Sequence, residues 1–371
     1  MRKHVAKLYI VLLVLGLFLP APLYYAMKAH LDSQSRENKA IGPFPVPTAE
    51  NYAEYPRKIE GWLGGILPFK NQIATIDGIM DYYVIGETRS TDVVIGRDGW
   101  LFYTGRQDAV EDPISDFLGT DLFTEEELTL ATSNLLAARD YMEQHGGRFL
   151  LVLSPSKMSI YPEMLPERYG KPAEYKRLQQ LADHLRDNTD LEVVRCYEEL
   201  QAYKQAFPED RIFLKYDTHE TYVGSYVSAD AILRVLGQPP LPELHSLTWQ
   251  PNENGEADLA NILGIKKLVH DDFNCWNVAF HRHYIDDWMN ETETELRFAN
   301  TEGNGTPEKL MLVSDSFGEG MIPFLADYYN ESYMVYPGTY TPEILEREQP
   351  DILIYQVTER LLPNLLKFVV E

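Results

Sequence analysis

The chain has 371 residues, 44% of them hydrophobic and 12% aromatic, which is enough for a sizeable folded core and excludes a disordered polypeptide. Its formal net charge of −24 disfavours nucleic acid and other polyanions as partners. The two cysteines, Cys196 and Cys275, do not have the short ligand spacing of a structural zinc site. Whether they form a disulfide is left open by the sequence.

The first element along the chain is an uncharged stretch of 20 residues, Leu8 to Met27, which matches the thickness of the hydrocarbon core of a bilayer. Basic residues precede it, so we expect residues 1–7 to be cytoplasmic and the rest to be exported. The alternative is a cleaved secretory signal peptide. We favour an uncleaved transmembrane helix, kinked at Pro20 and Pro22, because the apolar run is long and lacks a clear small-residue cleavage site. The predicted location is therefore the cell membrane, with a single pass and the C-terminal domain outside the cytoplasm.

The remainder divides into a lead-in and a folded domain. Residues 28–56 are polar and contain several prolines, which is typical of a stalk. Residues 57–371 have the pattern of an α/β domain, within which residues 237–305 are hydrophilic and irregular and form a predicted insertion.

Local signals place the elements of this domain. Val93–Tyr103 predicts two short strands around a tight turn, in which Gly99 takes a positive φ. Thr124 and Glu127 predict a capping box for a helix over Glu125–Gln144. The further strands are expected at Arg148–Leu153, Leu191–Arg195, Lys309–Val313, Ser332–Val335 and Ile352–Gln356. The further helices are expected at Tyr175–Asn188, Tyr197–Ala206, Thr221–Leu236, Glu319–Tyr328, Thr341–Glu348 and Glu359–Phe368. This alternation predicts a largely parallel sheet flanked by helices.

Two segments carry residues for acyl-transfer chemistry. The buried strand ending at Val313 is followed by Ser314-Asp315-Ser316, which places Ser316 at the carboxyl end of a sheet strand, where α/β folds bind their ligands. Asp217 and His219 follow the apolar segment 212–216, which we expect to be another strand. A serine nucleophile needs a base and a group that orients this base, so Ser316, His219 and Asp217 are the candidate catalytic set.

The surroundings of Ser316 support the same interpretation. We expect its backbone N–H, with other donors at the start of the next helix, to stabilise an oxyanion, and Gly318 and Gly320 to allow a close approach of substrate. Taken singly, the serines could merely cap a helix, and an Asp-x-His pair is often a loop hydrogen bond. The combination favours catalysis.

Four further residues are candidate substrate contacts: Lys157, Tyr161, Tyr216 and Ser314. The alternative is structural hydrogen bonding for Lys157 and Tyr161, packing for Tyr216 and helix capping for Ser314. His281 and His283 have a spacing that suits a metal, but no third ligand is apparent. We therefore expect no metal site and no cofactor.

Several sequence blocks resemble the SGNH-hydrolase-like O-acetyltransferases of the AlgJ/AlgX type, which acetylate alginate and other cell-surface polysaccharides. The blocks are Gly96–Tyr103, Pro155-Ser156-Lys157, Ile160–Glu163, Leu165-Pro166, Asp217-Thr218-His219, Asp258-Leu259-Ala260, Ser314–Phe317, Pro350-Asp351-Ile352 and Glu359-Arg360. Their order follows that of the family over about residues 50–371. One departure is Glu220, at a position that is often tryptophan in the family.

The resemblance implies an SGNH-hydrolase-like (flavodoxin-like) fold, permuted so that the Asp and His precede the Ser. It also implies transfer of an acyl group, usually acetyl, to a hydroxyl of an exported polysaccharide, with Ser316 as nucleophile, His219 as base and Asp217 as its orienting partner. The partner it implies is a multi-spanning membrane acyltransferase of the MBOAT class. The alternatives are a carbohydrate esterase with the same three residues, and a non-catalytic glycan-binding subunit of an export complex.

Overall fold

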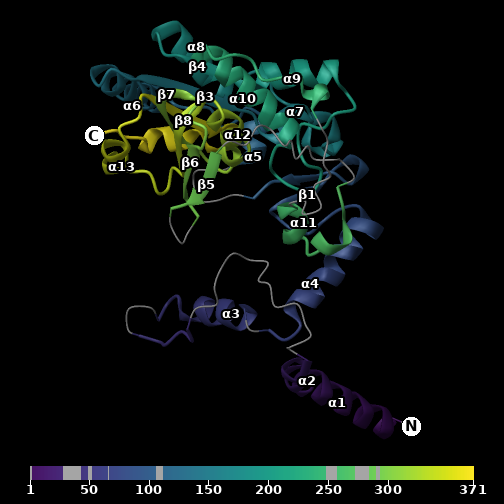
Figure 1. Ribbon diagram of the computed structural model, residues 1–371. Coiled ribbons are helices and arrows are strands. Elements are labelled where there is room, and N and C mark those ends of the chain that lie inside the picture. The colour runs from purple at the N-terminus through teal and green to yellow at the C-terminus, as the bar shows by residue number, and fades with distance from the viewer. Residues whose placement is uncertain are drawn as a thin grey trace. The chain divides into compact units, whose positions relative to one another are not determined.

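The structure is a computed structural model that describes residues 2–27, 43–48, 52–65, 67–105, 112–247, 257–271, 284–289 and 293–371. The chain divides into two compact units. The first consists of Met1–Ser90 and Asp258–Val269, and the second of Thr91–Ala257 and His270–Glu371. In Figure 1 the second unit contains the sheet and the helices that surround it.

The segment predicted to span a membrane, residues 8–27, belongs to two helices, α1 (Arg2–Phe18) and α2 (Pro20–Met27). They meet at Leu19, directly before Pro20, because proline has no amide proton and disfavours a helical residue before it. Among the residues described, no helix combines the length and the apolar character needed to cross a membrane. The single transmembrane helix predicted from the sequence is therefore not found.

The rest of the first unit is also helical. Its elements are α3 (Tyr55–Gly65), α4 (Lys70–Ile79), a π-helix over Met80–Ile85, α11 (Asp258–Ile262) and a 3-10 helix over Lys266–Leu268. Gly78 allows α4 to approach the turn after α11, since a Cβ there would lie 1.8 Å from the carbonyl oxygen of Leu263. The hydroxyl of Tyr83 donates to the carbonyl of Leu268 at 2.9 Å. Part of the segment predicted as an insertion thus packs in this unit.

The second unit is built on a seven-stranded sheet with the order β4-β3-β9-β7-β8-β6-β5. The strands are β3 (Arg148–Ser154), β4 (Val193–Arg195), β5 (Tyr284–Trp288), β6 (Glu295–Asn300), β7 (Thr306–Val313), β8 (Tyr329–Val335) and β9 (Ile352–Thr358). The five strands from β4 to β8 are parallel, while β6 and β5 extend one edge as antiparallel strands. The predicted parallel-rich α/β sheet is confirmed, and the antiparallel edge was not predicted.

Helices cover both faces of this sheet because its central strands are apolar on both sides. Leu150 and Val152 of β3 belong to one core, and Leu151 and Leu153 belong to the other. The first core includes side chains from α9 (Cys196–Ala206), α10 (Tyr222–Leu236) and α12 (Phe317–Ala326). The second includes side chains from α6 (Glu125–Gln144), α8 (Arg177–Asn188) and α13 (Pro342–Glu348). Two short helices, α5 (Pro113–Phe117) and α7 (Lys157–Ile160), complete the unit.

Two local predictions are confirmed in detail. The capping box of α6 is present, with the Thr124 hydroxyl accepting the Glu127 N–H and the Glu127 carboxylate accepting the Thr124 N–H. The predicted hairpin consists of β1 (Val93–Ile95) and β2 (Leu101–Tyr103), and Gly99 in its turn has φ 72°.

One prediction is wrong, and another is confirmed with a different helix type. The segment after Ile212 is not a sheet strand but forms an isolated bridge, Phe213 to Glu220, because it folds back on itself through backbone bonds. The closing helix is a 3-10 helix over Glu359–Lys367, and Pro363 inside it cannot donate the backbone bond of a regular α-helix.

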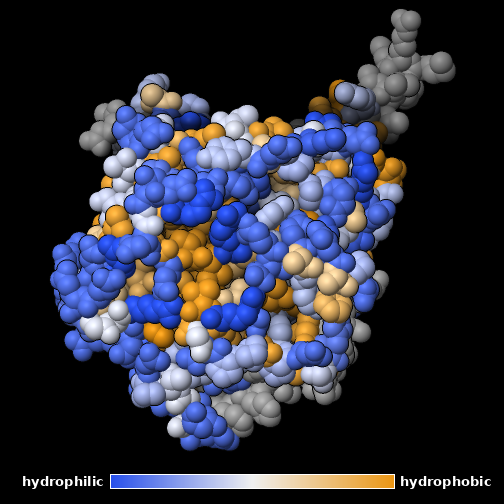
Figure 2. All heavy atoms as spheres, turned by 90° about the horizontal axis from the view of Figure 1, so that it is seen from above, coloured by the Kyte–Doolittle hydropathy of each residue, from blue (hydrophilic) through white to orange (hydrophobic). Residues whose placement is uncertain are grey.

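The surface agrees with the acidic composition. Seen from above, hydrophilic residues cover most of the visible face, and hydrophobic residues gather towards its middle (Figure 2). The hydrophilic majority is expected for a chain of formal charge −24.

Candidate active site

The sheet positions Ser316. This residue lies in the turn between β7 and α12, at the carboxyl edge of the parallel strands, and is half-buried. The buried carboxylate of Asp315 holds the turn. Its Oδ1 accepts the N–H of Phe317 at 3.0 Å, and its Oδ2 accepts the N–H of Thr358, at the end of β9, at 2.9 Å. The turn is thereby fastened to the neighbouring strand.

A loop outside the sheet positions Asp217 and His219. The N–H of Leu214 donates to the carbonyl of His219 at 3.1 Å, and the N–H of Thr221 donates to the carbonyl of Ile212 at 2.7 Å. These bonds close the loop just before α10, whose N-cap is Thr221. We refer to residues 212–221 as the base loop.

The structure brings the three predicted side chains together. The Ser316 Oγ lies 2.7 Å from Nε2 of His219, and Nδ1 of His219 lies 2.6 Å from Oδ1 of Asp217. The same Oδ1 accepts the backbone N–H of His219 at 2.9 Å. Asp217 is fully buried, whereas about a quarter of the His219 side chain is exposed. The arrangement keeps a proton on Nδ1, so that Nε2 is free to accept the serine proton.

The turn offers fewer N–H donors to an oxyanion than the sequence predicts. The N–H groups of Phe317, Gly318 and Glu319 all donate within the turn, to Asp315 Oδ1 and to the carbonyls of Asp315 and Ser316. Within the described part of the chain, the N–H of Ser316 has no such acceptor. It is therefore the donor of this turn that is available to a developing oxyanion.

Two of the predicted substrate contacts are structural instead. Ser314 is fully buried and its hydroxyl bonds to the side chain of Gln356. Tyr161 is also buried, its hydroxyl accepts the N–H of Ile212 at 3.0 Å, and burial raises its pKa to about 12. Ser314 therefore supports the turn that carries Ser316, and Tyr161 supports the base loop.

Both glycines after Ser316 also meet protein rather than substrate. A Cβ at Gly318 would lie 2.3 Å from the Ser314 hydroxyl, and a Cβ at Gly320 would lie 2.3 Å from the Ser225 hydroxyl. The predicted role in substrate approach is therefore wrong, and these positions serve the packing of α12.

Lys157 is buried, and its ammonium group donates to the backbone carbonyls of Leu101, Lys215 and Asp217. It therefore supports the base loop. Tyr216 is partly exposed next to Asp217, and its contact with a substrate stays a prediction.

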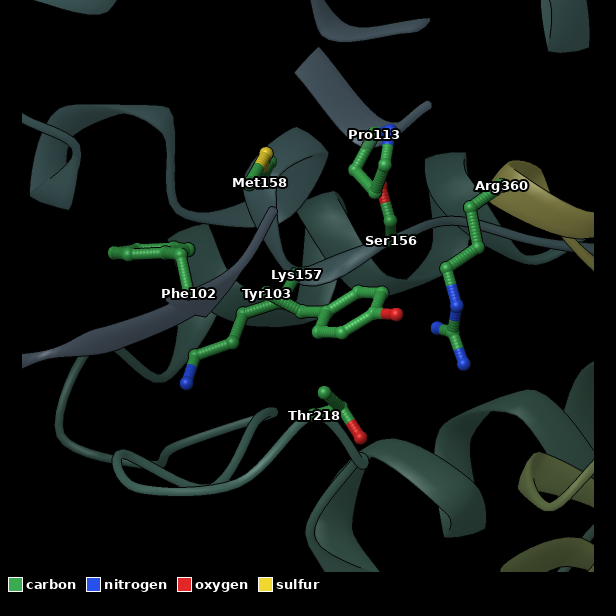
Figure 3. A pocket seen from close by; sticks show the side chains of 8 residues that line it. All are labelled: Phe102, Tyr103, Pro113, Ser156, Lys157, Met158, Thr218 and Arg360. Atoms are coloured by element: carbon green, nitrogen blue, oxygen red, sulfur yellow. The ribbon is translucent and has the colours of Figure 1, made fainter. Parts of the chain in front are cut away.

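A pocket lies next to the base loop (Figure 3). The base loop carries Asp217 and His219, which with Ser316 we call the triad. Its lining residues are Phe102, Tyr103, Pro113, Ser156, Lys157, Met158, Thr218 and Arg360. Thr218 belongs to the base loop, and the Arg360 guanidinium lies 5.9 Å from the ring of Phe317, next to the nucleophile. Tyr103 and Arg360 point towards each other across the pocket.

Sequence reasoning missed two buried acids that surround this site. Glu220 follows His219, and burial, with the charge of Asp315, raises its pKa to about 8. Glu359 accepts the N–H and the hydroxyl of Ser156 at 3.0 and 2.9 Å, and also binds Ser159 and Lys176. Glu359 belongs to one of the sequence blocks that carry the family resemblance, but no local pattern indicates that it is buried.

Two questions that the sequence raises depend on residues outside those described. Cys275, His281 and His283 fall in this part of the chain, so neither the disulfide nor the metal spacing is tested. Cys196 is buried, and burial raises its pKa to about 12.

Comparisons with known proteins point to the same family as the sequence blocks. Residues 93–283 match the family model "SGNH hydrolase-like domain, acetyltransferase AlgX". The chain is 26% identical over 205 residues to a probable alginate O-acetylase AlgJ of Pseudomonas putida, covering 54% of this chain and 49% of that protein. The chain thus spans about half the length of the curated relatives it matches.

Two solved structures share the fold. The structure of Bacillus cereus PatB1 is 14% identical, with 74% of this chain and 99% of that chain covered and a TM-score of 0.50. A DHHW family protein from Eubacterium siraeum is 16% identical, with 76% and 98% covered and a TM-score of 0.50.

Proposed function

The chain belongs to the family of SGNH hydrolase-like, AlgX-type acetyltransferase domains, and on that premise we propose that it is an O-acyltransferase for a polysaccharide. In this proposal an acyl group, most simply acetyl, moves to a polysaccharide hydroxyl through an ester on Ser316. The observation that carries the proposal is the hydrogen-bonded chain from Asp217 through His219 to Ser316.

In the first half of the reaction, Nε2 of His219 takes the proton of Ser316 as Oγ attacks the carbonyl carbon of the acyl donor. The N–H of Ser316 stabilises the oxyanion of the tetrahedral intermediate. His219 then gives its proton to the leaving group of the donor as the bond between acyl carbon and leaving group breaks. Asp217 stabilises the imidazolium throughout, because its Oδ1 binds Nδ1.

In the second half, an acceptor hydroxyl gives its proton to His219 and attacks the Ser316 ester. The ester bond breaks, and the proton returns to Ser316 Oγ. We propose that the acceptor meets the protein at the mouth of the pocket of Figure 3, which has room for about one hydroxyl-sized group and combines aromatic side chains with hydroxyl and guanidinium groups beside the base loop. Such a mixture suits a sugar, which has both an apolar face and hydroxyl groups.

The same proposal places the domain outside the cytoplasm, attached through its N-terminal segment, and supplied with acyl groups by a multi-spanning membrane acyltransferase of the MBOAT class. Its support is the uncharged sequence over residues 8–27 with basic residues before it, together with the family relationship. Protease treatment of intact cells tests the location: digestion of the domain without lysis is expected, and protection until lysis would contradict it.

The catalytic role is tested with Ser316→Ala. Acetyl transfer from p-nitrophenyl acetate to an oligosaccharide is measured for this variant and for Ser246→Ala, which removes an exposed hydroxyl elsewhere. We expect Ser316→Ala to lose transfer while staying folded, and Ser246→Ala to keep it. Transfer that survives in Ser316→Ala contradicts the role of Ser316 as nucleophile, and a wild-type protein that transfers no acetyl group supports the non-catalytic glycan-binding role. Acetate release that ignores the oligosaccharide supports the esterase.

A further inference from the structure

The side chain of Lys157 is one of few charged groups buried beside the triad. Lys157 is the first residue of α7, and only 6% of its surface is exposed. Its Nζ lies 2.7 Å from the carbonyl oxygen of Leu101, 3.0 Å from that of Lys215 and 2.9 Å from that of Asp217. An ammonium group has three protons, so each of these oxygens can accept one.

Two of those three carbonyls belong to the base loop. The oxygens of Lys215 and Asp217 flank Tyr216, and Asp217 lies two residues before His219. Among the described residues, no strand of the sheet pairs with this loop, which closes on itself through the bridge between Phe213 and Glu220. Its distance from Ser316 is therefore set by contacts such as those of Lys157.

The third carbonyl belongs to the hairpin of β1 and β2. Leu101 accepts from Lys157, and its own N–H donates to Lys215 at 3.0 Å, so the hairpin and the base loop share the same ammonium. The rings of Trp100 and Phe102 lie with their centroids 5.1 and 5.2 Å from Nζ, within cation–π range. The hairpin thus supplies both a hydrogen-bond acceptor and aromatic faces to the buried charge.

The backbone before Lys157 is held as well. Glu359, at the end of β9, accepts the N–H and hydroxyl of Ser156, and pairs with the buried ammonium of Lys176. Lys157 is therefore fixed between the carboxyl edge of the sheet and the loop that it binds. Glu359 thus holds Ser156, and the neighbouring Lys157 holds Asp217, so these contacts relate the position of Asp217 to that of β9. β9 in turn lies next to the turn that carries Ser316.

We propose that Lys157 is a positioning residue for acyl transfer: it holds the base loop so that the Asp217–His219 pair meets Ser316. The inference rests on the proposed function. It also differs from the substrate contact predicted from the sequence. A substrate contact changes KM, whereas a positioning residue changes the rate of acylation.

The test uses the full-length protein and p-nitrophenyl acetate. Lys157→Met keeps the apolar part of the side chain and removes the three donors. We expect the rate of Ser316 acylation to fall about 100-fold, as for a displacement of about 1 Å, with KM within about twofold of wild type. The matched control is Lys204→Met. Like Lys157, Lys204 donates to a backbone carbonyl, that of Ile160, and lies over an aromatic ring, that of Tyr161. Unlike Lys157, it donates to a carbonyl outside the base loop. It should keep the wild-type rate.

A spectroscopic measurement separates positioning from general destabilisation. The Nδ1 proton of His219 should give a low-field NMR resonance, which we expect Lys157→Met to shift or lose and Lys204→Met to leave in place. If Lys157→Met does not fold, Lys157→Arg is measured instead. It keeps the charge, but its planar fork does not fit three convergent carbonyls, so a loss of about tenfold in acylation is expected.

A wild-type acylation rate in the folded variant, or a raised KM at unchanged kcat, would overturn the proposal. Ser316→Ala distinguishes this failure from failure of the proposed function. If Ser316→Ala is inactive and the Lys157 variant is fully active, only the positioning role is wrong. If Ser316→Ala is fully active, the proposed function itself is wrong.

Discussion

The two halves of the candidate site are built in different ways. Ser316 follows a central strand of the sheet, and its turn is tied to β9 by one buried carboxylate. The base loop lies outside the sheet and is held by side chains from distant segments: Lys157, Tyr161 and Asp271, which accepts the N–H of Lys215 at 2.8 Å. The nucleophile is thus placed mainly by the pairing of a sheet strand, whereas the base loop depends in addition on hydrogen bonds from distant side chains.

This difference explains where the site is vulnerable. A sheet distributes its position over many hydrogen bonds and a packed core, so one substitution displaces it little. A loop held by a few side chains loses a large share of its constraint with each of them. We therefore expect that replacing a residue that supports the base loop lowers the reaction rate more than the loss of stability alone suggests.

The largest effect is expected inside the base loop itself. Asp217→Asn keeps the size of the side chain but places an amide against Nδ1 of His219, which favours the wrong imidazole tautomer. The rate of acyl transfer should fall by about 10⁴-fold, with the melting temperature close to that of wild type. Steady-state kinetics and thermal unfolding measure both. A loss below about tenfold would mean that Asp217 does not orient the base.

The next effect concerns the nucleophile turn. Asp315→Asn replaces one of two acceptors by an NH₂ group that faces the N–H of Phe317 or Thr358. Leaving a buried donor without an acceptor costs about 1–3 kcal/mol, so the free energy of unfolding should fall by that amount. Urea unfolding monitored by tryptophan fluorescence measures it. Because the sheet still places Ser316, the rate should fall less than in Asp217→Asn. The reverse order of rates would contradict the comparison.

A smaller effect is expected for Tyr161→Phe. The substitution removes the hydroxyl that accepts the N–H of Ile212 at the start of the base loop. We expect a stability loss of about 1 kcal/mol and a rate lowered by a few-fold at unchanged KM. Tyr175→Phe, at an exposed tyrosine, is the control. A KM raised about tenfold would instead restore the substrate contact predicted from the sequence.

The smallest effect on the reaction rate is expected at Glu220, where the prediction concerns the pH dependence of stability. Its carboxyl group, with a pKa raised to about 8 by burial, keeps a proton in the folded protein that the unfolded chain loses near pH 4.3. Wild-type stability should therefore fall as the pH rises from about 5 to 8, by at most ~1.4 kcal/mol per pH unit. Glu220→Gln lacks this loss, so its melting temperature relative to wild type should rise over the same range.

The control for this pH dependence is Glu243→Gln, which makes the same substitution at an exposed position. A difference between Glu220→Gln and wild type that stays constant from pH 5 to 8 would show that Glu220 is ionised in the folded protein.

The features that the sequence predicts correctly depend on residues close together along the chain. The alternation of apolar strands and helices predicts the parallel sheet, and the end of the strand at Val313 predicts the place of Ser316. The spacing of Asp217 and His219 suffices to predict their hydrogen bond, since two residues on one loop can meet.

The roles of the supporting residues depend on distant partners. Lys157 and Tyr161 follow a strand, as substrate-binding residues often do, but their partners lie about 50 residues away along the chain. The apolar segment at Ile212 resembles a strand because it is buried, although it pairs only within its own loop. Residues 295–300 form β6, between β8 and β5, and their mixed polarity did not reveal that they extend the sheet as an antiparallel strand.

The most direct test of the account is the mass of the Ser316 peptide after the protein is exposed to an activated acetyl ester and quenched in acid. We predict a gain of one acetyl group on Ser316 that disappears when an acceptor oligosaccharide is added before the quench. An unmodified Ser316 peptide, with acetyl transfer still proceeding in the same sample, would contradict the covalent mechanism.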